Sequence, residues 1–169
     1  MFKTFKFVYL LFMILTGFNS VSAYADITPY RVVVNELSFG EIFGFPGSCT
    51  LDYSTNVVTN NSGFLCAEGL RFGVPGKIVI YGNPNKVMSI RLRNKINDGD
   101  GLAFSASGVF NVSGLPDTIL IADNPQLINT GSTGNIVINF GGTLTNTTQQ
   151  NFSQAFELII EDALEFTEQ

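Results

Sequence analysis

Two cysteines carry the chemistry that the sequence indicates most directly. Cys49 and Cys66 are the only cysteines of the chain, and sixteen residues lie between them. An even number of cysteines in an exported chain favours a disulfide, and closing a loop of this size stabilises a fold by roughly 3 kcal/mol. Two buried free thiols are the alternative, because such a pair alone does not indicate a metal site. We predict a Cys49–Cys66 disulfide.

The sequence gives little support for catalytic chemistry. The sequence contains no histidine, which excludes Ser-His-Asp and Cys-His nucleophilic systems and histidine-bound zinc. A glycosidase needs only two carboxylates, but Glu36 and Glu41 flank a predicted strand, and Glu157 and Glu161 resemble a solvated face. We expect a protein that is not an enzyme and that uses no cofactor and no metal.

One acidic stretch matches the beginning of a calcium-binding loop. Asp98 and Asp100, within NDGDG (97–101), have the spacing that opens a calcium-binding loop. The rest of the EF-hand pattern, including its distant Glu, does not follow. A tight turn is therefore the preferred interpretation.

The first residues have the pattern of a secretory leader. Lys3 and Lys6 precede the apolar run FVYLLFMIL (7–15), and an A-x-A-like cleavage signal ends at Ala25. A helix needs about 20 apolar residues to cross a bilayer, so an uncleaved anchor is the less favoured alternative. We predict a signal peptide over 1–25 and no stable membrane span after its removal.

The remainder has the size of one domain and an acidic balance. Without the leader, 144 of the 169 residues remain, with seven basic and fourteen acidic side chains and a formal charge of −7. No basic stripe is present to neutralise phosphates, so nucleic acid is not an expected partner.

Apolar and polar residues alternate along short segments that turn residues separate. The segments are rich in β-branched and aromatic residues, and the separators are rich in Gly, Pro, Asn and Asp. This spacing predicts an all-β chain folded as a β-sandwich. The predicted strands are 37–43, 76–82, 87–94, 102–112, 118–122 and 135–145.

The region after the leader carries an alternation of its own. Tyr30, Val32 and Val34 alternate, and the pattern then changes phase, as if two strands had been joined end to end. We therefore separate an N-terminal extension, 26–36, from a β-sandwich domain, 37–166.

The last apolar stretch fits two periods. Residues 152–166 match both a strand alternation and a helical stripe, and periodicity alone does not decide between them. The glycine-rich β context favours a strand to about Asp162, with frayed residues after Phe166.

Three blocks of the sequence resemble a bacterial secreted family. The blocks LSFGEIFGFPGSCTLDYSTN (37–56), LRFGVPGKIVIYGNPNKVMSIRL (70–92) and NIVINFGGTLTNTTQQNFSQAFELIIE (135–161) are similar to domain of unknown function 4402, whose members look like fimbrial major subunits. The chain departs from the family pattern in its two cysteines and in Phe-Ser-Gln at 152–154, where Tyr-Ser-Gly is usual. The matching positions are Phe39, Gly40, Gly47, Thr50, Gly82, Asn83, Pro84, Gly141, Gly142, Thr143, Leu144 and Gln149 or Gln150.

The resemblance implies an immunoglobulin-like, pilin-type sandwich that lacks one strand and is completed by β-augmentation from a neighbour. The extension would then be the donor strand, with Ile27, Tyr30, Val32 and Val34 entering the neighbour's groove at roughly 1.5 to 3 kcal/mol each. The implied function is a structural subunit of a bacterial surface fibre that supports adhesion.

The same resemblance implies partners and a location. Identical or related subunits and a periplasmic assembly chaperone are the expected partners, and the chain is expected to pass through the periplasm to the cell surface or the medium. The alternative is that the extension pairs within its own sheet. The protein would then be a monomeric secreted binding module that presents loops such as 94–101 or 123–134.

Overall fold

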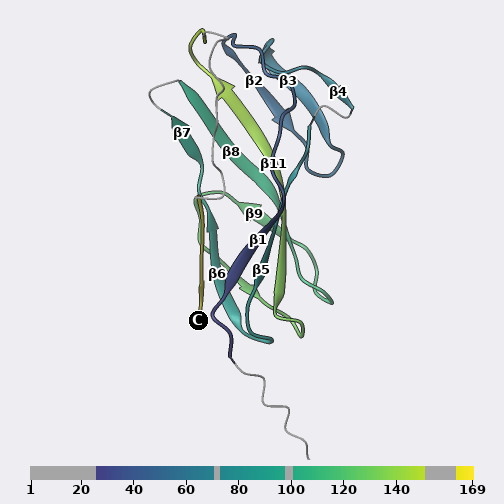
Figure 1. The fold of residues 1–169 in the computed structure, drawn as a ribbon, viewed down its shortest axis with the longest axis vertical. Coiled ribbons are helices and arrows are strands. Elements are labelled where there is room, and N and C mark those ends of the chain that lie inside the picture. The colour runs from purple at the N-terminus through teal and green to yellow at the C-terminus, as the bar shows by residue number, and fades with distance from the viewer. Residues whose placement is uncertain (1–25, 71–72, 98–100, 151–162) are drawn as a thin grey trace, which may run out of the picture.

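The structure is a computed structural model, and it describes residues 26–70, 73–97, 101–150 and 163–169. This part of the chain is all-β, and every strand pair is antiparallel (Figure 1). The strands are β1 (Tyr30–Asn35), β2 (Gly47–Leu51), β3 (Val57–Gly63), β4 (Gly69–Leu70), β5 (Gly76–Tyr81), β6 (Val87–Leu92), β7 (Lys95–Asn97), β8 (Leu102–Asn111), β9 (Thr118–Ile121), β10 (Gln126–Asn129), β11 (Asn135–Asn146) and β12 (Leu164–Glu168).

The larger sheet is organised around β11. One side of β11 pairs with β8, while its other side pairs first with β5 and then with β2. Beyond β5 lies β1, and beyond β2 lie β3 and β4; β7 and β9 pair with the far side of β8. The smaller sheet has the order β10-β6-β12.

Alternating side chains of both sheets form one hydrophobic core. β5, β6 and most of β8 and β11 bury every second residue, as the period of a pleated strand requires, and burying one such side chain contributes about 1.5–3 kcal/mol. The largest fully buried side chains include Ile78 and Ile80 of β5, Met88, Ile90 and Leu92 of β6, Phe104 and Phe110 of β8, and Ile136, Ile138 and Phe140 of β11.

Two glycines mark the point where β11 changes partner. A Cβ on Gly141 would lie 2.1 Å from the carbonyl oxygen of Leu51, closer than any real carbon approaches. Gly142 has a φ of +146°, and a Cβ there would lie 2.2 Å from the carbonyl oxygen of Ser105. Only residues without a side chain allow β2 and β8 to approach β11 this closely.

The strand predictions between 76 and 146 are largely confirmed. β5, β6, β8, β9 and β11 lie where the alternation places them. The predicted strand 37–43 is wrong, because that stretch makes only the isolated bridges Ser38–Val74 and Ile42–Cys66. Phe39 is nevertheless buried in the core. The alternation therefore indicated a buried side chain, but not pairing with another strand.

The C-terminal expectations have two outcomes. The predicted strand that ends near Asp162 falls in 151–162, outside the described residues. The expectation of frayed residues after Phe166 is wrong, because β12 continues to Glu168 and pairs with β6 through Met88.

Candidate assembly edge

The predicted N-terminal extension, 26–36, contains β1, which pairs with β5 of its own chain. The register places Tyr30 opposite Tyr81 and Val32 opposite Val79, with an irregularity between Val33 and Asn35. The rings of Tyr30 and Tyr81 stack with centroids 5.0 Å apart. Among the described strands, β5 is the only one that pairs with β1, which leaves β1 at the end of the ladder (Figure 1).

The four residues of the predicted donor strand lie together at this edge. Ile27, Tyr30, Val32 and Val34 are 43%, 51%, 42% and 51% exposed, and so none of them fills a groove in its own chain. Pairing of β1 inside the chain is the arrangement that the intramolecular alternative predicts. The role of these residues between copies stays a prediction.

The two faces of β1 differ in their surroundings. Residues that lie directly opposite each other in a ladder share a face of the sheet, so Arg31 lies on the same face as the buried Ile80. The Arg31 guanidinium donates to the carbonyl oxygen of Leu164 on β12 at 3.4 Å. This contact links the edge of the larger sheet to the edge of the smaller one.

A buried asparagine holds the segment that leads into β1. Asn83 follows β5 and is 6% exposed. Its side-chain oxygen accepts from the Ile27 N–H at 2.8 Å, and its side-chain nitrogen donates to the Ile27 carbonyl oxygen at 3.0 Å. The amide thus pairs with the main chain of Ile27 much as a strand residue would, beyond the last paired residue of β5.

The same asparagine holds the C-terminal strand. The Asn83 side-chain nitrogen donates to the Glu168 carboxylate at 2.9 Å, and the Asn83 main-chain N–H donates to it at 3.1 Å. These bonds favour the ionised carboxylate, and they hold the pKa of Glu168 below its ordinary value of 4.5. A carboxylate only accepts, so it fixes the orientation of the amide with its oxygen toward Ile27.

Thr130 forms hydrogen bonds with the turn that contains Asn83. Its hydroxyl, on a residue with 0% exposure, donates to the Asn83 carbonyl oxygen at 2.7 Å and accepts from the Lys86 N–H at 3.0 Å. We name Asn83, Glu168 and Thr130 the terminal clamp, because they hold residue 27 and residue 168 at one end of the domain. Sequence reasoning missed the clamp, since GNPN looked like a simple turn and the last residues looked frayed.

The predicted disulfide is present in the other half of the larger sheet. Cys49 on β2 is bonded to Cys66, which follows β3, and their Cα atoms are 6.1 Å apart. Both cysteines are buried in the core. The bond fastens β2 and the segment after β3 to the core.

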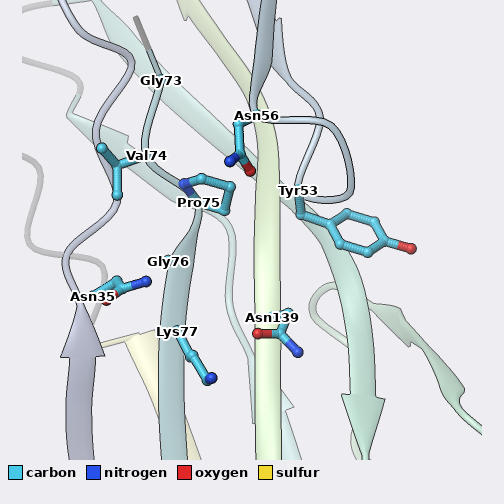
Figure 2. Close-up of a pocket in the computed structure, with 9 residues that line it drawn as sticks. All are labelled: Asn35, Tyr53, Asn56, Gly73, Val74, Pro75, Gly76, Lys77 and Asn139. Atoms are coloured by element: carbon cyan, nitrogen blue, oxygen red, sulfur yellow. The ribbon is translucent and has the colours of Figure 1, made fainter. Parts of the chain in front are cut away.

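A polar hollow of about 330 Å³ lies where β5 and β2 diverge from β11 (Figure 2). None of its lining residues is acidic, and Figure 2 shows the Tyr53 ring directed away from Pro75. None of the residues predicted from sequence lies there, and we assign it no ligand. The lining residues are Asn35, Tyr53, Asn56, Gly73, Val74, Pro75, Gly76, Lys77 and Asn139.

The described residues contain neither a candidate metal site nor a candidate membrane-spanning helix. In 26–70, 73–97, 101–150 and 163–169, no three His, Cys, Asp or Glu side chains are grouped so that they could bind a metal ion. Within the same ranges, no helix has the length and apolar character needed to cross a membrane. Asp98 and Asp100 of the acidic stretch lie outside these ranges.

No family model, curated protein or solved structure matches the chain. The resemblance to domain of unknown function 4402 therefore stays a prediction.

Proposed function

We propose that this protein is an exported, non-enzymatic structural subunit of a bacterial surface fibre, whose copies are linked by exchange of β1. In this proposal the two sheets form an immunoglobulin-like, pilin-type sandwich. The strand that completes β5 in each subunit comes from the next subunit. Identical or related subunits are the partners, and an assembly chaperone protects the open edge before exchange.

The peripheral position of β1 carries the proposal. Within the described residues, its contacts with the domain include a main-chain ladder to β5, the Tyr30–Tyr81 stack, the Arg31 contact and the Ile27 contact. No residue of β1 belongs to the buried core. A strand from a second copy would make the same ladder and the same contacts, so exchange costs little free energy beyond the entropy of association.

The β5 edge that would be exposed if β1 left also favours exchange of β1 between copies over simple opening of β1 in one copy. A strand edge with free N–H and C=O groups beside apolar side chains associates readily with any extended chain. In a fibre each donated β1 covers the β5 edge of the neighbouring copy, whereas an opened monomer leaves its own β5 edge exposed. Exchange is therefore the route by which β1 leaves its own sheet without exposing β5.

Cysteine trapping tests the exchange in the full mature chain. Val32 and Val79 face each other across the ladder, and opposed strand residues have Cα separations that suit a disulfide. Chains with Val32→Cys are mixed with chains with Val79→Cys and given brief pulses of oxidant. We expect a mixed, disulfide-linked dimer on non-reducing gels.

The control replaces Ile119, an exposed residue of β9 on the opposite edge. Val32→Cys chains mixed with Ile119→Cys chains should give no mixed dimer above the collision background. Equal yields in the two mixtures would contradict exchange.

A monomeric binding module is the second candidate, and the intramolecular β1–β5 ladder favours it. It predicts that Val32→Cys and Val79→Cys link only when both are in one chain. It also predicts a single monomeric elution peak for the mature protein at high concentration.

A further inference from the structure

We infer that Asn83 is the residue that receives the N-terminal segment of a neighbouring copy, by pairing with the main chain of residue 27. The inference rests on the proposed exchange of β1 and names the contact that recognises the incoming strand. Asn83 is a positioning residue here, because it holds the main chain that leads into the strand beside the end of β5.

The clamp is built for a main chain rather than for a particular side chain. Both contacts from Asn83 go to the N–H and the carbonyl oxygen of Ile27, while the Ile27 side chain remains exposed. An extended segment therefore satisfies the amide whatever its side chain. The alternation of the β1 side chains sets the register, since a slip of one residue would turn every one of them to the other face, and Asn83 then holds the main chain of residue 27.

Departure of β1 leaves the Asn83 side-chain oxygen without the hydrogen-bond donor that it has in the closed monomer. When Ile27 moves away, the buried Asn83 oxygen loses the N–H that it accepts, and Glu168 continues to hold the amide nitrogen in place. A buried acceptor without a donor is costly. The empty clamp therefore favours the return of an extended segment, from the same chain or from another.

This arrangement predicts different effects on rate and on final yield. Removing the Asn83 contact weakens the closed monomer and the exchanged pair equally, so the population of mixed dimer at equilibrium should not change. Opening of β1 precedes exchange and becomes easier, so the rate should rise. Loss of hydrogen bonds to a buried amide predicts an increase of about tenfold.

The test measures how fast Val32→Cys and Val79→Cys chains form mixed dimers when both also carry Asn83→Ala. We expect about tenfold faster appearance of mixed dimer and the same final yield. Asn124→Ala is the matched control, because Asn124 is an exposed asparagine in the turn between β9 and β10. It should leave both the rate and the yield unchanged.

A second variant acts on the other partner of the contact and leaves the core intact. Ile27→Pro removes the N–H that Asn83 accepts, at a position before the strand where proline is tolerated; Ile27→Ala keeps the N–H. Ile27→Pro should speed exchange by no more than Asn83→Ala does, because it keeps the bond from the Asn83 amide nitrogen to the carbonyl oxygen of residue 27, and Ile27→Ala should not speed it. The double variant should be no faster than Asn83→Ala alone, because Asn83→Ala already removes both bonds to residue 27.

The outcomes separate the two claims. If Val32→Cys and Val79→Cys chains that keep Ile27 and Asn83 give no mixed dimer, both the exchange and the inference fail. If mixed dimers form but both variants leave the rate within twofold, only the role of Asn83 fails. If the final yield rises about tenfold, Asn83 holds its own segment alone and does not receive a neighbour's, which also overturns the inference.

Discussion

β1 and β11 lie on the two sides of β5 and use the same kind of antiparallel ladder, yet they differ in everything else. β11 buries Ile136, Ile138 and Phe140 in the core, whereas each apolar side chain of β1 is more than a third exposed. The comparison teaches that a ladder alone does not make a strand part of the core. The side chains decide whether a strand can leave without unfolding the domain.

The largest expected effect contrasts one residue from each strand. Phe140→Ala on β11 should lower the free energy of unfolding by about 3–5 kcal/mol, because it removes a buried ring that lies against Gly76. Val32→Ala on β1 should lower it by less than about 1 kcal/mol. Urea unfolding of both variants measures the contrast, and similar losses would show that β1 belongs to the core.

The disulfide extends the contrast to the β2 half of the sheet. Replacing Cys49 and Cys66 together by alanine should lower the free energy of unfolding by about 3 kcal/mol, because the closed loop restricts the unfolded chain. Chemical unfolding with and without reductant measures the loss. The double variant has no cysteine left, so reductant should not change its unfolding; equal stability of the double variant and the oxidised protein would contradict the stabilisation.

The aromatic stack joins a side chain of β1 to a side chain of β5. Tyr30→Ala should lower the free energy of unfolding by about 1 kcal/mol and increase amide exchange along β1, since a stacked pair contributes about 0.5–1.5 kcal/mol. Tyr30→Phe keeps the ring and serves as the control. Equal amide exchange in the two variants would show that the stack does not hold β1.

The smallest effect is a pH dependence at the terminal clamp. The folded-state pKa of Glu168 lies below its ordinary value of 4.5, so the ionised form stabilises the clamp above that value. This stabilisation is lost as the pH falls from 4.5 through the lowered pKa. Amide exchange at Ile27, followed by NMR and corrected for intrinsic rates, should increase over that window.

A variant shows whether Glu168 causes this loss. Glu168→Gln removes the titration at the clamp, so protection of Ile27 should become flatter with pH below 4.5. An unchanged profile would assign the pH dependence to another carboxylate.

Much of the core could be predicted from the sequence, and some strands could not. The alternation in β5, β8 and β11 follows from one face packing inward, which any sequence with one buried face must encode. β2 and β3, GSCTL and VVTNNSG, were missed. Their Gly, Ser and Asn residues are typical of turns, and tertiary pairing overrode that local preference.

The candidate site divides in the same way. The apolar alternation of Tyr30, Val32 and Val34 identified a strand that differs from the rest. Nothing local indicated Asn83, because the clamp joins it to Ile27 across 56 positions and to Glu168 across 85. A single asparagine in a turn motif carries no sign of which distant segments it will meet.

By itself, the sequence determined the all-β class, the disulfide partners and the buried face of most long strands, because these depend on residue type and on the period of two. Only the tertiary structure decided that β1 pairs with β5, that β11 exchanges β5 for β2 at two glycines, and that Asn83 holds both ends of the domain. The physical reason is that alternation tells which residues share a face but not which strand lies alongside, and that choice is settled by packing across the whole core.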